Sequence, residues 1–121
     1  MSLTANWSYP TAIRFGAGRI KEIAEACAKH GMQLVGGVDV AMVGEAGPKL
    51  EAFKAAGAKH INIQLCDHDT EIRKAVPVAR AVMQAGKELK LMPAIEWHRD
   101  TCTETPEKGL ALAEQYEKRY K

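Results

Sequence analysis

The sequence predicts an α/β fold of three to four parallel βα units, arranged either as part of a barrel or as a small open parallel sheet. The main observation is that Gly and Pro divide the chain into segments whose apolar residues recur alternately with strand and helix periods. The 121 residues suffice for one domain and exclude a full eight-unit barrel of roughly 250 residues. The 46% hydrophobic and 26% charged content is ordinary for a globular domain and excludes a disordered chain.

The first half of the chain predicts two strand–helix pairs. Residues 9–15 are expected to be extended, and Gly16-Ala17-Gly18 then opens a helix over residues 19–29 whose apolar residues fall on one face. A strand follows over residues 34–41. The Gly-Pro pair within residues 47–57 starts a short helix that a second glycine ends.

The third pair has the clearest strand pattern. Residues 60–66 alternate apolar and polar side chains, which predicts a strand with one buried face. A loop follows in which Asp69 or Thr70 is expected to cap a helix over residues 71–88. Pro77 lies inside that helix and should kink it, because proline removes a backbone hydrogen bond.

The last pair is a strand over residues 89–97 and a final helix that reaches about residue 120. Thr105-Pro106 fits the N-cap and first helical position. The helix is expected to pack Leu110, Ala113 and Tyr116 against the core. Strands that alternate with helices in this way form parallel βα units with right-handed crossovers.

Charge and cysteine content restrict the function classes. A net charge of +2 is too small to suggest a nucleic-acid partner, and no apolar run approaches the roughly 18 residues of a bilayer helix. The N-terminus lacks a secretory signal, so we expect a cytoplasmic protein. The spacing of Cys27, Cys66 and Cys102 fits neither a disulfide framework nor a metal clip. Each is interpreted as a small buried side chain in a reducing compartment.

Two strand-end segments carry side chains suited to chemistry, because parallel α/β folds bind ligands at the carboxyl ends of their strands. The first is Cys66-Asp67-His68-Asp69, which packs two carboxylates and an imidazole into one loop. The alternative interpretation is that this loop only caps the next helix and that His68 is solvated.

The second segment runs from Glu96 to Glu104. In extended geometry Glu96 and His98 share one face, and Trp97 and Arg99 take the other. A carboxylate and an imidazole from one strand end suit a divalent cation, and His98 could instead contact a substrate hydroxyl. The alternative is that both residues serve as partners of nearby basic side chains.

The stretches "AGAKHINIQLCDHDT" and "AIEWHRDTCTETPEK" give the chain from about residue 34 onward a resemblance to the xylose isomerase-like TIM-barrel superfamily of sugar isomerases and epimerases. The resemblance implies a partial TIM barrel in which Glu96 of "IEWH" binds a divalent metal such as Mn, Mg, Co or Zn. It implies substrate contacts for His98 and, more loosely, for His68. The superfamily takes further ligands from later strands, so we expect weak metal binding here.

The beginning of the chain follows a different pattern. The stretch "NWSYPTAIRFGAGRIKEIAEACAKHGM" resembles the N-terminal segment of iron-containing alcohol dehydrogenases. That resemblance implies a nucleotide-binding role for the turn at Gly16 and Gly18, whose amides could face a phosphate. The family's "GGGS" loop and its His and Asp iron ligands do not occur, and Asp39 is a poor match for the acidic residue of a GxGxxG motif. A plain turn into a helix is the alternative.

Two truncated resemblances suggest a fragment or chimera, with one segment over residues 1–33 and the other over 34–121, folded as one compact unit. Three functions stay open: a metal-dependent sugar isomerase or epimerase remnant, a nucleotide-binding oxidoreductase fragment, and a non-catalytic interaction module. Enzyme activity, if present, would be the first of these. The expected partners are a small sugar-like ligand and further copies of the chain, because a partial barrel leaves its sheet edges open.

Overall fold

The computed structural model describes residues 4–8 and 12–118. The chain divides into two compact units where the sequence predicts one: an N-terminal unit, Met1–Leu34, and a C-terminal unit, Val35–Lys121. The division lies beside residue 33, where the two family resemblances meet. None of the helices in the described ranges is long and apolar enough to cross a membrane.

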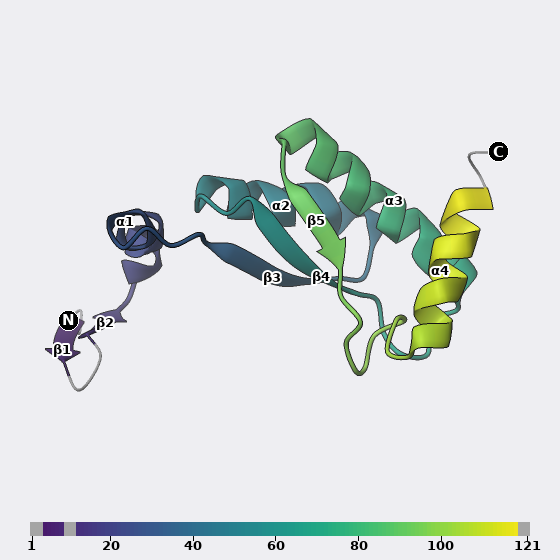
Figure 1. The fold of residues 1–121 in the computed structure, drawn as a ribbon, viewed down its shortest axis with the longest axis horizontal. Helices are drawn as coiled ribbons and strands as arrows, with labels where there is room; N and C mark the ends of the chain where they lie inside the picture. Colours follow the sequence, from purple (N-terminus) through teal and green to yellow (C-terminus); the bar gives the residue numbers. More distant parts are fainter. Residues whose placement is uncertain (1–3, 9–11, 119–121) are drawn as a thin grey trace. The chain divides into compact units, whose positions relative to one another are not determined.

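The N-terminal unit is a hairpin followed by a short helix (Figure 1). Strands β1 (Thr4–Ser8) and β2 (Ala12–Gly16) pair antiparallel. A 3₁₀ turn, Arg19–Glu22, leads into α1 (Ile23–Lys29). The expected extended segment over 9–15 lies partly outside the described residues, and its described part belongs to this hairpin instead of a parallel unit. A parallel pair would need a crossover of a dozen or more residues, which this short connection cannot supply.

The C-terminal unit contains an open parallel sheet, and this part of the predicted fold class is confirmed. Its strands are β3 (Val35–Val40), β4 (His60–Leu65) and β5 (Met92–Ile95), in the order β3-β4-β5. The strands of the described residues close no barrel. The sheet therefore has three strands, at the lower end of the predicted three to four units.

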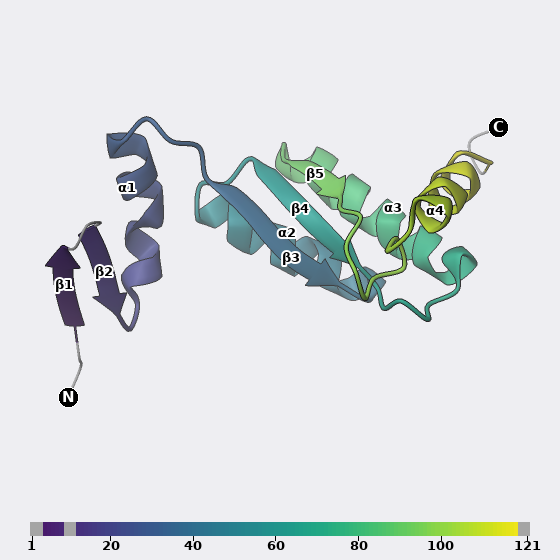
Figure 2. The same cartoon turned by 60° about the horizontal axis from the view of Figure 1, so that its bottom comes forward.

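One face of this sheet is covered by α2 (Ala46–Ala55) and α3 (Ile72–Leu89), which lie behind the strands in Figure 2. Alternation along each strand decides which side chains enter the core, because neighbouring residues point to opposite faces. The fully buried members of this core include Val40, Leu50, Ile61, Ile63, Leu65, Ala79 and Val82.

The opposite face of the sheet carries no helix in the described part of the chain (Figure 2). Its residues are exposed or half-buried: Val35, Gly37, Asp39, His60, Asn62, Gln64, Met92, Ala94 and Glu96. Parallel sheets are usually covered on both faces, so a one-sided parallel sheet with polar side chains on its open face is unusual.

The helix α3 begins differently from the prediction. Its N-cap is Glu71, and no side chain there accepts a capping hydrogen bond. Thr70 instead uses its Oγ1 to accept a hydrogen bond from the Asp67 amide at 3.3 Å, which turns the loop before the helix. The expected cap by Asp69 or Thr70 is therefore wrong. Pro77 lies inside α3 as predicted, on its exposed face.

The last helix, α4 (Pro106–Lys118), begins as predicted, because Thr105 Oγ1 accepts a hydrogen bond from the Lys108 amide at 3.3 Å. The predicted buried face is wrong in part. Leu110 is 60% exposed and Ala113 is exposed, whereas Leu112 is buried in the core and Gly109 is buried beside the Trp97 ring. Tyr116 packs as expected near the core, under the guanidinium of Arg80 at 4.7 Å.

Candidate functional site

A cavity of about 370 Å³ lies at the carboxyl ends of β3, β4 and β5. We call it the strand-end cavity. Residues of β3 and β4 and of the segments that follow β3, β4 and β5 line it: Asp39, Val40, Ala41, Gln64, Cys66, Asp67, His98, Arg99, Asp100 and Thr101. Side chains from segments far apart in the sequence thus lie together at this edge, where parallel α/β folds bind their ligands.

Backbone hydrogen bonds extend the sheet past the formal ends of its strands. The Cys66 amide donates to Val40 at 3.0 Å, and the Cys102 amide donates to Leu65 at 3.1 Å. Between these bonds the chain leaves the sheet, with left-handed conformations at Cys66 (φ 53°) and Asp100 (φ 63°). The loop after β5 therefore departs from the sheet, passes the cavity and returns to pair again with β4.

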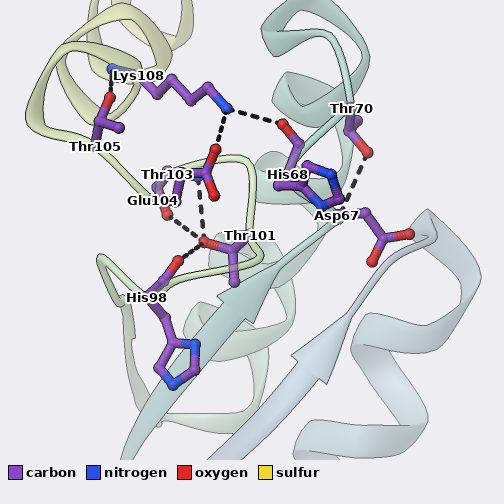
Figure 3. A network of polar contacts seen from close by, with 9 residues as sticks. All are labelled: Asp67, His68, Thr70, His98, Thr101, Thr103, Glu104, Thr105 and Lys108. Carbon is purple, nitrogen blue, oxygen red and sulfur yellow. Dashed lines mark hydrogen bonds and ion pairs between the residues drawn. The ribbon is translucent and has the colours of Figure 1, made fainter.

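Two buried threonines hold this loop in shape (Figure 3). Thr101 Oγ1 donates to the His98 carbonyl at 2.6 Å. Thr103 Oγ1 donates to the Glu96 carbonyl at 2.9 Å. The Thr103 amide also donates to Thr101 Oγ1 at 3.3 Å. No role was predicted for either threonine. Their signal was a Thr-x-Thr pattern directly after a strand-end turn, where hydroxyls commonly bond to the backbone.

His98 is half-buried and lines the strand-end cavity. Its Nδ1 lies 2.8 Å from the Arg99 carbonyl oxygen. Because a carbonyl only accepts, this contact requires the proton on Nδ1, which leaves Nε2 of the neutral ring as an acceptor. His98 can thus accept a hydrogen bond from a ligand hydroxyl.

Glu96 is placed differently from His98. It stands opposite Gln64 in the extended β4–β5 register, on the open face of the sheet, and it is not part of the cavity lining. The prediction that Glu96 and His98 share a strand face fails because β5 ends at Ile95, so strand alternation does not continue to residue 98. For the same reason Arg99 lines the cavity beside His98 instead of facing away from it.

His68 lies on the loop after β4 and is exposed. Its carbonyl accepts a hydrogen bond from Lys108 Nζ at 2.9 Å, and the same ammonium pairs with Glu104 at 2.5 Å. The hydrogen bond from Lys108 is the main cause that lowers the pKa of Glu104. Figure 3 shows the His68 and His98 rings apart, on different loops. The structure does not bring the His68 imidazole into the cavity lining, whereas its neighbour Asp67 is part of it.

A complete metal site is not formed by the residues that the structure describes. Among them, no group of three or more His, Cys, Asp and Glu side chains is arranged to hold a metal ion. The acidic residues of the cavity, Asp39, Asp67 and Asp100, surround it without forming such a group. Glu96 and His98 give at most two ligands, and a catalytic cation needs a larger convergent set. Metal ligation by Glu96 stays a prediction.

A second cavity of about 370 Å³ lies in the N-terminal unit, where Gly16 is part of its lining. Gly18 precedes the 3₁₀ turn in a left-handed conformation (φ 78°), as a tight turn requires. Two cationic side chains line this cavity, but both pair with Glu22: Arg14 at 3.2 Å and Arg19 at 3.0 Å. A phosphate would have to displace that carboxylate.

Comparison of the chain with protein-family models, with curated proteins and with solved structures found no match. The resemblances to sugar isomerases and to iron-containing alcohol dehydrogenases therefore rest on the sequence stretches that suggested them. The arrangement of the C-terminal unit itself supplies the argument for function.

Proposed function

We propose that the C-terminal unit is a segment of a sugar isomerase- or epimerase-like barrel, in a fragment or chimera, and that it binds a small sugar-like ligand in the strand-end cavity. The observation that carries this proposal is the lining of that cavity by hydrogen-bonding side chains from β3, from β4 and from the loops that follow β4 and β5. Parallel α/β proteins place their ligands at this edge of the sheet.

The cavity has the size and the donors for a polyhydroxylated ligand. Its volume of about 370 Å³ lies within the range of roughly 300–1,000 Å³ that small-molecule sites occupy. The carboxylate of Asp39 accepts hydrogen bonds from hydroxyls, and the Gln64 amide can both donate and accept. Arg99 donates, and His98 Nε2 accepts. A sugar presents both donors and acceptors at every hydroxyl, so it can use this mixed set.

The charge of the cavity favours a neutral ligand. Three carboxylates, Asp39, Asp67 and Asp100, face one guanidinium, Arg99, so the local charge is negative although the chain carries +2 overall. A phosphorylated sugar would meet net repulsion here. We therefore propose an unphosphorylated sugar or polyol.

We propose binding without turnover for this chain. Proton transfer between vicinal carbons in metal-dependent isomerases requires a cation held by several converging ligands, and the described residues form no such group. The nucleotide-binding alternative at Gly16 and Gly18 is less favoured, because the arginines beside that turn are paired with Glu22.

The test is a titration of the ¹⁵N-labelled full chain with D-xylose and, separately, with xylose 5-phosphate, followed by amide chemical shifts. We expect saturable shifts at Asp39, Gln64 and residues 98–101 with the neutral sugar, and weaker binding of the phosphate ester. The His98→Ala variant should bind more weakly, because alanine removes the Nε2 acceptor.

His30→Ala, at an exposed position of the N-terminal unit, is the matched control and should leave binding unchanged. Shifts confined to the turn at residues 16–18, or an equal loss of binding in both variants, would contradict the proposal. The absence of any saturable shift with a panel of neutral pentoses and hexoses would also contradict it.

A further inference from the structure

Cys66 and Cys102, which are 36 residues apart in sequence, stand opposite each other at the carboxyl end of the sheet. The register follows from the backbone bonds. In the β4–β5 ladder the Met92 amide donates to the carbonyl of Lys59, the residue before its partner His60. The Cys102 amide donates in the same way to Leu65, the residue before Cys66.

This register brings the two side chains within the reach of a covalent bond. Neighbouring strands lie roughly 4.8 Å apart, and disulfides span Cα–Cα distances of about 4.4–6.8 Å. The two thiols lie close enough together for each to shift the pKa of the other. The Cys66 thiol also lies 3.8 Å from the carbonyl oxygen of Ala41, the residue after β3.

The two cysteines differ in accessibility and in acidity. Cys66 is half-buried and lines the strand-end cavity, whereas Cys102 is fully buried behind it. The hydrogen bond from Cys102 lowers the pKa of the Cys66 thiol, although partial burial and the nearby carboxylates of Asp67 and Glu45 oppose that effect. The same hydrogen bond and burial raise the pKa of Cys102. Cys66 is thus the thiol that a reagent can reach and that ionises more easily.

We propose that Cys66 and Cys102 form a reversible redox pair that closes to an intramolecular disulfide at the floor of the strand-end cavity. This interpretation differs from the sequence-based one, in which all three cysteines are inert buried side chains. It does not depend on the proposed sugar binding, because it rests on the register of the loop after β5 and not on a ligand.

The co-reactant is a low-molecular-weight disulfide such as oxidised glutathione. The Cys66 thiolate attacks one of its sulfur atoms, which forms a mixed disulfide and releases one glutathione thiolate that takes up a proton. Cys102 then loses its proton to solvent and attacks the Cys66 sulfur, which releases the second glutathione. The two protein thiols are oxidised by two electrons, and the small disulfide is reduced to two thiols.

The disulfide-bonded form would restrict the motion of the loop that carries His98. The bond would tie residue 102, where this loop rejoins the sheet, to residue 66, where the loop after β4 begins. Both loops contribute to the strand-end cavity. Oxidation would therefore remove the Cys66 thiol from the cavity wall and restrict the segment between Glu96 and Cys102.

The test is to incubate the full chain with oxidised glutathione, block free thiols with N-ethylmaleimide, and map the peptides by mass spectrometry. Before the block, we expect an intact mass lower by two hydrogens. After the block, we expect a Cys66–Cys102 cross-link and one N-ethylmaleimide group, on Cys27. If dithiothreitol is added before the block, the disulfide should be reduced and all three cysteines should then be alkylated. The Cys27→Ser variant should form the same cross-link.

The Cys102→Ser variant lacks the second thiol, so the reaction should stop at the mixed disulfide between Cys66 and glutathione. It should accumulate glutathione on Cys66, whereas Cys66→Ser should react slowly at Cys102. Circular dichroism of each variant verifies that it is folded. Stable glutathionylation of Cys66 in the wild-type chain, or cross-links that join only different molecules, would overturn the proposal.

Discussion

Gly36 of β3 lies directly against the ring of Phe53 in α2, so closely that a Cβ at position 36 would stand 2.4 Å from Phe53 Cδ1. The adjacent Gly37 points to the open face, where an added Cβ would meet no atom within 4 Å. The two adjacent glycines thus have different structural roles. Gly36 permits α2 to approach the sheet, and Gly37 leaves the open face flat.

We therefore expect Gly36→Ala to destabilise the chain by about 1–3 kcal/mol, because the methyl group overpacks the contact with Phe53. Gly37→Ala is the matched control and should be neutral or slightly stabilising. Urea unfolding followed by circular dichroism measures both variants. Equal stability of the two variants would mean that α2 adjusts its position without cost.

Pro77→Ala should stabilise the chain by about 2 kcal/mol, because alanine supplies the backbone N–H that the Arg73 carbonyl lacks inside α3. This value already subtracts the stabilisation that proline gives by reducing the entropy of the unfolded chain. Lys87→Ala, at an exposed position of the same helix, should change stability by less than about 0.5 kcal/mol. Thermal unfolding of both variants provides the measurement. A loss of stability in Pro77→Ala would show that the proline positions α3 favourably.

We predict that the chain self-associates through the edges of its parallel sheet, since β3 and β5 each have only one partner strand in the described part of the chain. Light scattering at micromolar concentrations should give a mass above that of the monomer. Val35→Lys, at a 54% exposed position of the β3 edge, should shift the equilibrium toward monomer. A monomeric wild-type chain over the whole concentration range would refute edge pairing.

Divalent metal should bind weakly. Calorimetric titration with Mn²⁺ should show a small, unsaturated heat in the wild-type chain and in Glu96→Ala alike, because two protein ligands leave most of the roughly six coordination positions to water. Tight binding that Glu96→Ala abolishes would restore the metal-dependent enzyme as the preferred function.

Acid should weaken the ion pair between Glu104 and Lys108 at the start of α4. Lys108 lowers the pKa of Glu104 below its ordinary value of 4.5, so the stabilising contribution of this pair is present above the unfolded-state pKa and is lost as pH falls through the lower folded-state pKa. Glu104→Gln should reduce the urea midpoint at neutral pH, and the difference from wild type should vanish well below pH 4.5. Glu51→Gln, at an exposed position of α2, should show no such pH dependence.

The parallel part of the fold was predictable because its signals are local. Strand alternation over residues 60–66 and the Thr105-Pro106 cap depend on neighbouring residues alone, and the structure agrees with both within a residue. The hairpin was missed because the pairing of Thr4–Ser8 with Ala12–Gly16 is a relation between segments. In α4 the choice between Leu110 and Leu112 depends on the position of α3, which the helix period does not contain.

The candidate site was predictable as a place and not as a set of residues. The rule that ligands bind at carboxyl strand ends pointed to the segments after β4 and β5, and residues of both segments line the strand-end cavity. Which side chains enter the cavity depends on where β5 ends and on how Thr101 and Thr103 bond to the returning loop. Strand alternation applied beyond Ile95 therefore paired His98 with Glu96 instead of with Arg99.

The position of Pro93 makes the two edges of the sheet unequal in their ability to pair with an added strand. In β5 the backbone N–H groups of Met92 and Glu96 donate to β4. The backbone N–H positions of the odd-numbered residues between them therefore point away from β4, toward the open edge. Proline at one of these positions removes an outward donor without cost to the existing ladder. No proline interrupts β3. An added strand would find a full set of outward donors only beside β3, which gives the sheet a preferred direction of extension.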